Sequence, residues 1–136
     1  DPVGKLLKWC EGEWKEPGIN GKATPLLPAM RAWQREDCES FWGPSLHYNT
    51  YLGCYVMFLN KAKGQGWKQE GIYISFNEDL ANPLGWSQPQ KIFQGGHWYP
   101  QVIGLGERET DKLAGSFARF FMGGFSQWEI VFSKES

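Results

Sequence analysis

Short runs in which apolar and polar residues alternate recur along most of the chain, separated by turn-forming residues. In the clearest run, residues 72–76, Ile72, Ile74 and Phe76 would share one face of a β-strand. Six further runs have a similar character, at 46–50, 55–60, 90–93, 101–105, 117–122 and 128–133. No stretch beyond about ten residues keeps a helical period without meeting Gly or Pro. The pattern therefore predicts an all-β protein.

The order of these strands repeats weakly along the chain. The segments "GPSLHY", "YVMFLN" and "GIYISF" find counterparts in "YPQVIG", "ARFFMG" and "WEIVFS", with Pro44 corresponding to Pro100. Units of roughly 40 to 55 residues with three or four antiparallel strands are typical of β-propeller blades. We therefore predict a single domain of about two and a half propeller-like blades, with a barrel or a sandwich as the alternative closure. Its predicted parts are an outer strand region at 1–36 and blades at 37–94 and 95–136.

Composition and charge narrow the choice of partners. A chain of 136 residues with 41% hydrophobic residues can build one globular core, and its net charge is −1. Its 14 Lys and Arg residues are scattered, which argues against a nucleic-acid partner. The longest apolar run, 55–59, is far shorter than the roughly 20 residues of a membrane-spanning helix, so no membrane partner is expected. A homo-oligomer, in which copies of the chain associate to close the ring of blades, is compatible with the sequence.

The cysteines and motifs predict neither a metal nor a cofactor. Cys10, Cys38 and Cys54 lie far apart, and only His47 and His97 could add imidazole ligands. Free buried thiols are the favoured prediction, with a bridge such as Cys10 to Cys38 as the alternative. We find no glycine-rich phosphate loop, zinc-protease motif or nucleophile elbow.

Four segments resemble consecutive parts of the five-bladed β-propeller glycosidase superfamily, which includes arabinanases, xylosidases and invertase-like enzymes, and they are most similar to its bacterial members. The segments are "FWGPSLHYNTYLGCYVMFLN", "QEGIYISFNEDLANPLGWSQPQKI", "HWYPQVIGL" and "ARFFMGGFSQWEIVFS", which cover most of 40–134. The resemblance implies a ligand pocket on the propeller axis, where innermost strands begin, with carboxylates that hydrolyse glycosidic bonds. Many members place their general acid in a Glu-Gly-Pro motif, whereas this chain has Trp42-Gly43-Pro44. The catalytic Asp expected in the first blade also has no counterpart.

The resemblance places aromatic and polar residues at the mouths of two innermost strands. Aromatic rings stack on the C–H faces of sugars, and neighbouring polar side chains bond to their hydroxyls. Six residues are predicted to form such a sugar subsite: Trp42, Ser45, His47, Trp98, Tyr99 and Gln101. The loop at 61–70 should overlook the same mouth, which makes Glu70 the predicted replacement for the catalytic carboxylate, ahead of Glu39 and Asp37.

Each candidate also has a purely structural interpretation. Trp42 and Trp98 could be packing wedges, His47 a hydrogen-bonded structural residue, and Glu70 a solvated turn carboxylate. Residues 106–112 are predicted to be a solvated loop. The leading hypothesis is thus a carbohydrate-binding or glycosidase-like protein. The alternatives are a non-catalytic structural or protein-interaction module, and a fragment whose chemistry lies in a partner chain.

Overall fold

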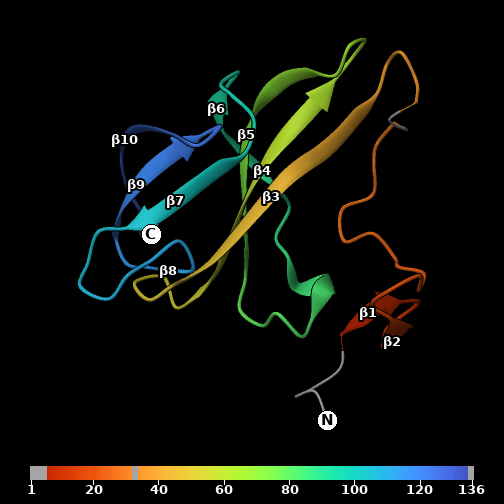
Figure 1. Cartoon of the computed structure of the whole chain (residues 1–136), viewed down its shortest axis with the longest axis horizontal. Helices are drawn as coiled ribbons and strands as arrows, with labels where there is room; N and C mark the ends of the chain where they lie inside the picture. Colours follow the sequence, from red (N-terminus) through yellow and green to blue (C-terminus); the bar gives the residue numbers. More distant parts are fainter. Residues whose placement is uncertain (1–5, 32–33, 135–136) are drawn as a thin grey trace.

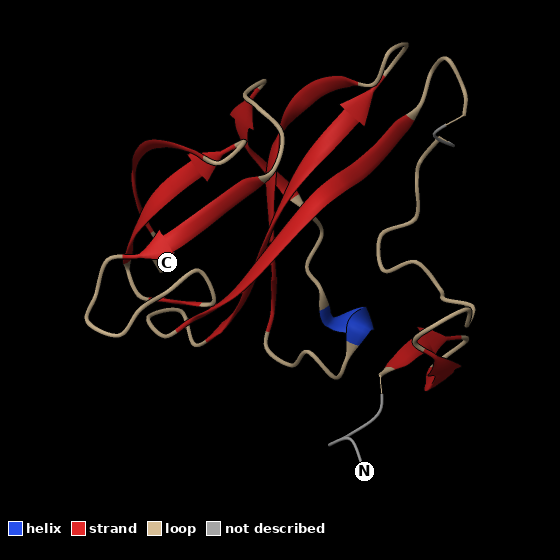
Figure 2. Ribbon diagram, in the orientation of Figure 1, coloured by secondary structure: helices blue, strands red, loops and turns tan. Residues whose placement is uncertain are grey.

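The computed structural model describes residues 6–31 and 34–134, which form three β-sheets (Figure 1). Within those ranges the helical structure is a single 3₁₀ turn, η1 (Pro83–Gly85), so the all-β prediction is confirmed (Figure 2). The region predicted at 1–36 is described only in part, because 1–5 and 32–33 lie outside these residues. The strands are β1 (Leu7–Cys10), β2 (Glu13–Pro17), β3 (Glu39–Asn49), β4 (Cys54–Lys63), β5 (Lys68–Asn77), β6 (Gln90–Gln94), β7 (Pro100–Gly104), β8 (Leu113–Ala114), β9 (Phe117–Met122) and β10 (Phe125–Val131).

The largest sheet has five strands in the order β6-β5-β4-β3-β8. Strands β3 to β6 follow one another as an antiparallel meander, and β8 joins β3 in parallel. Side chains of β4 alternate between the two faces, so Phe58 packs on one side and Met57 and Leu59 pack on the other. Both sets are buried, which explains why residues 55–59 form an unbroken apolar run.

The second sheet has three antiparallel strands in the order β10-β9-β7. Gly123 and Gly124, both with positive φ, form the tight turn between β9 and β10. Val102 and Phe120 point inward and are buried, whereas Ile103 on the opposite face is 39% exposed. The period of two is therefore that of a sheet with one buried face and one open face.

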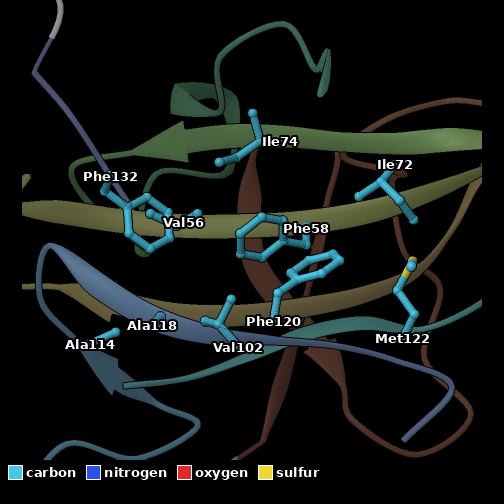
Figure 3. Packing of buried hydrophobic residues seen from close by; sticks show 10 residues of the cluster. All are labelled: Val56, Phe58, Ile72, Ile74, Val102, Ala114, Ala118, Phe120, Met122 and Phe132. Carbon is cyan, nitrogen blue, oxygen red and sulfur yellow. The ribbon is translucent and has the colours of Figure 1, made fainter. Parts of the chain in front are cut away.

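The main core lies between these two sheets (Figure 3). Val56 and Phe58 of β4 meet Val102 of β7 and Phe120 of β9 there. A smaller cluster lies on the other face of the five-stranded sheet and consists of Met57, Leu59 and Tyr73. Leu27 from the irregular segment after the β1–β2 hairpin packs against this cluster.

The predicted strands all exist, although some of their boundaries were wrong. The strand predicted at 46–50 begins at Glu39, so Trp42, Gly43 and Pro44 lie inside β3 rather than ahead of it. The strand predicted at 90–93 is β6, which begins at Gln90 after η1 and an irregular segment. Proline sets this start, since Pro89 has no backbone N–H to donate to a ladder and Pro83 begins η1.

The three cysteines are free thiols in the structure, as the favoured prediction stated. Cys10 and Cys38 are buried, whereas Cys54 is half-buried at the start of β4. The thiol of Cys38 donates to the Gly64 carbonyl at 3.3 Å, and burial raises the pKa of the Cys54 thiol.

Candidate functional site

A bulge in β3 brings its first half close to β7. Trp42 is opposite Asn60 and Ser45 is opposite Phe58, so β3 holds one more residue than β4 over this span. Gly43 adopts a φ of 58°, in the left-handed region that glycine accommodates without strain. A Cβ atom on Gly43 would lie 3.1 Å from Cδ1 of Tyr99. Glycine at this position therefore lets the Tyr99 ring rest against the β3 backbone.

Tyr99 is held by a buried asparagine. Its backbone has a φ of 61°, an uncommon conformation for a residue with a side chain. The Tyr99 N–H donates to Oδ1 of Asn60 at 2.7 Å, and Nδ2 of Asn60 donates to the His97 carbonyl at 3.0 Å. Asn60 is fully buried, while Tyr99 is 66% exposed. Strained residues held by their surroundings cluster at binding sites, and this one presents an aromatic ring to solvent.

A groove of about 430 Å³ lies between the β3 bulge and the start of β7, and we call it the Tyr99 groove. Its volume is in the usual range for small-ligand sites. Its lining residues are Gly43, Pro44, Ser45, Leu46, Tyr99, Pro100, Gln101 and Lys112. The Ser45 hydroxyl donates to the Pro100 carbonyl at 2.6 Å, so the two sheets are tied together within the groove itself.

Gln101 and Lys112 contribute polar side chains to the lining of the Tyr99 groove, and Asp111 interacts with both from outside the lining. Nε2 of Gln101 donates to Oδ2 of Asp111 at 3.4 Å, and Nζ of Lys112 lies 3.4 Å from the same oxygen. The side chains of Asp111 and Lys112 are 44% and 72% exposed. The groove thus combines an exposed aromatic ring with an amide and an ammonium group that can hydrogen-bond to a ligand.

The groove brings together three of the six predicted sugar-binding residues: Ser45, Tyr99 and Gln101. Trp42 lies on the other side of the bulge, in a separate hollow of about 270 Å³ where its ring packs edge-on against Trp67 at 5.2 Å between centroids. Trp98 is half-buried and does not line the groove, and its carbonyl accepts from the Gly123 N–H at 2.7 Å.

His47 lies in the main core rather than at the mouth of a strand. The imidazole is 3% exposed and packs against the rings of Phe58 and Phe132, at centroid distances of 6.2 and 5.4 Å. Nδ2 of Asn49 lies 3.2 Å from its Nε2 atom. Burial lowers the pKa of His47 from 6.5 to about 4, because the apolar surroundings disfavour the imidazolium. The neutral ring therefore fills the core at physiological pH.

Glu70 is held by two neighbours away from the groove lining. Its carboxylate accepts from the Tyr73 hydroxyl at 2.6 Å and from the ammonium of Lys91. Burial by itself would raise the pKa of Glu70, but these hydrogen bonds outweigh burial and hold the pKa below its usual value. A carboxyl group with a lowered pKa is ionised at neutral pH and cannot donate a proton as a general acid.

The two secondary carboxylate candidates are also paired. Glu39 accepts from Lys61 and Arg31, both at 2.8 Å, and the hydrogen bond from Lys61 is the main cause of its lowered pKa. Asp37 is bound by Arg35 at 2.7 Å on the surface. Both carboxylates form ion pairs near the N-terminal end of β3, and neither lines the Tyr99 groove.

Three residues of the site were not predicted from the sequence: Asn60, Asp111 and Lys112. Asn60 directly follows the apolar run at 55–59 within β4, and a polar residue after a buried run is the signal that could have identified it. Asp111 and Lys112 lie in the segment predicted to be a solvated loop, which is irregular as expected, and no local signal distinguishes them there.

The described part of the chain contains no group of three or more His, Cys, Asp or Glu side chains arranged to hold a metal ion. Across residues 6–31 and 34–134, no helix has the length and apolarity needed to span a membrane. No protein-family profile, curated protein or solved structure was found to match this chain.

Proposed function

We propose that this protein binds carbohydrate in the Tyr99 groove. The observation that carries the proposal is the exposed Tyr99 ring, held by Asn60 and resting against Gly43 beside polar side chains. An exposed aromatic ring can stack on the C–H face of a sugar, and pre-organising it lowers the entropic cost of binding. Gln101 and Lys112 line the same groove and would offer hydrogen-bonding side chains to the hydroxyls of a sugar.

Binding without hydrolysis is the activity that the geometry supports best. Glycoside hydrolysis uses two carboxyl groups that flank the scissile bond. Among the described residues, Asp111 is the carboxylate that bonds to groove residues, through Gln101 and Lys112. Glu70 is ionised and paired with Lys91, so it supplies no proton to a leaving group.

We also propose that the two sheets are consecutive blades of a β-propeller. The supporting features are the sequential antiparallel meanders β3 to β6 and β7, β9, β10, with the first strand of the second meander against the first strand of the first (Figure 2). Association of copies would complete a ring of such blades. Light scattering tests this, because a solution mass of 15.6 kDa, that of one chain, would contradict closure by association.

The test of carbohydrate binding is calorimetric titration with a panel of arabino-, xylo- and cello-oligosaccharides. We expect Tyr99→Ala to weaken the binding of a positive sugar by about tenfold or more, the usual effect of removing a central aromatic contact. Tyr51→Ala is the matched control, since Tyr51 is 41% exposed and lies outside the groove lining. Absence of binding across the panel, or equal affinity of Tyr99→Ala and wild type, would contradict the proposal.

A further inference from the structure

We propose that a second site binds a small uncharged aromatic molecule in the cavity between the two sheets, independently of the Tyr99 groove. This inter-sheet cavity has a volume of about 260 Å³. Phe58, Ile74 and Phe120 line its inner part, and all three belong to the main core (Figure 3). Ile92 of β6 and Trp128 of β10 lie at its rim, where they are 47% and 39% exposed.

The lining chemistry selects an apolar ligand. Every side chain that lines the inter-sheet cavity belongs to Phe, Ile, Val or Trp, so a charged group inside would lose water without gaining a side chain of opposite charge. A saccharide fits this lining poorly, because it carries a hydroxyl on most of its carbons and the indole N–H of Trp128 is the one hydrogen-bonding side-chain group among the lining residues. Phe120 and Trp128 lie 5.9 Å apart between centroids, and Phe93 lies 5.1 Å from Trp128, so an inserted ring would meet aromatic edges and faces.

The size of the cavity indicates more than one ring. An apolar protein cavity of about 150 Å³ stays dry and binds benzene. At about 260 Å³, the inter-sheet cavity has room for a molecule of two aromatic rings. It is partly open to solvent on the side of Val131, which is 63% exposed, so a ligand would also cover apolar surface that now faces water.

The topology provides an entrance. Strand β6 is the edge of the five-stranded sheet and β10 is the edge of the three-stranded sheet, and they do not pair with each other. These two strands can therefore move apart without breaking ladder hydrogen bonds. A ligand that enters the cavity between these strands would disrupt side-chain contacts at the rim, such as the contact between Phe93 and Trp128.

The test uses 6-propionyl-2-(dimethylamino)naphthalene, an uncharged dye with two fused aromatic rings whose fluorescence increases in apolar surroundings. We expect a saturable increase with one dye per chain, and Ile130→Trp, which fills the cavity from β10, should weaken binding by about tenfold or more. Ile103→Trp is the matched control, because it makes the same change on the outward face of β7 and should leave affinity within about twofold. If circular dichroism shows that Ile130→Trp does not fold, Ile92→Trp narrows the entrance from the more exposed β6.

Three results would overturn the proposal. The first is the absence of a saturable signal, and the second is equal loss of dye binding in the Ile130 and Ile103 variants. The third is a wild-type dimer that Ile130→Trp converts to monomer, because a second copy would then be the natural occupant of the cavity. Titration of the dye in the presence of each panel saccharide should give unchanged affinity, and displacement would place both ligands in one site. A positive dye result alongside a negative sugar panel would contradict the carbohydrate proposal alone.

Discussion

Mild acidification should destabilise this protein through His47. The imidazole is almost completely buried beside two phenylalanine rings, and its pKa is lowered to about 4. In the unfolded chain the same group titrates near its ordinary value of 6.5. The unfolded state therefore binds a proton at a pH where the folded state does not, and stability falls as the pH drops through this window.

The size of the effect follows from the two pKa values. The interval from 6.5 to about 4 corresponds to about 3 kcal/mol, because each pH unit between them costs about 1.4 kcal/mol for one proton. The contribution of neutral His47 is fully present above 6.5 and is lost as the pH falls toward about 4. The pKa values of Glu39 and Glu70 are lowered from 4.5, so their ion pairs persist through most of this interval.

Urea unfolding followed by tryptophan fluorescence, from about pH 8 to about pH 5, measures the slope that linkage requires. His47→Gln keeps a hydrogen-bond acceptor for Asn49 and removes the titration, so its free energy of unfolding should be flat over that range. His97→Gln, which removes the exposed histidine, should keep the wild-type slope. A flat wild-type profile, or an equal slope in His47→Gln, would refute the reasoning.

Three further outcomes follow from the site geometry. Asn60→Leu should cost about 3 kcal/mol in urea unfolding and abolish saccharide binding, because it leaves the Tyr99 N–H without its buried acceptor. Gly43→Ala should cost more stability than Gly53→Ala by about 1 kcal/mol, since both have positive φ but only the first Cβ meets neighbours within 4 Å. Glu70→Gln should leave saccharide affinity within about twofold of wild type and lower the free energy of unfolding at neutral pH by about 1 kcal/mol. Calorimetry should show that this difference in stability between variant and wild type vanishes as the pH falls below 4.5.

Alternation along a strand could be predicted from the sequence, whereas position along the strand could not. Ile72, Ile74 and Phe76 share a face and pack in or against the main core, as their spacing predicted. Ser45 and His47 also share a face, but His47 lies two residues farther along β3, about 6.6 Å deeper at the rise of a strand. That distance separates the groove from the core, and nothing in the local sequence states where the second sheet begins to cover β3.

The features that could not be predicted from the sequence depend on contacts between residues that are far apart in the chain. The interpretation of Trp42-Gly43-Pro44 as a strand entrance was wrong because the bulge depends on how β3 pairs with β4. Glu70 was assigned to the site because it belongs to the segment 61–70, but its partner Lys91 is 21 residues away and contacts it from β6. Such pairings depend on register and sheet docking, which a single sequence does not specify.

The hydrogen bonds that join β3 and β4 to the start of β7 have a consequence for folding. The groove contains residues from both sheets, joined through Ser45 to Pro100 and through Asn60 to Tyr99. Neither sheet alone contains the whole site, so a ligand in the groove would contact both sheets and stabilise them against separation. At a concentration of about one hundred times its Kd, such a ligand would add about 2.7 kcal/mol to the free energy of separation. Occupancy would then govern how readily proteases reach the core of this small protein.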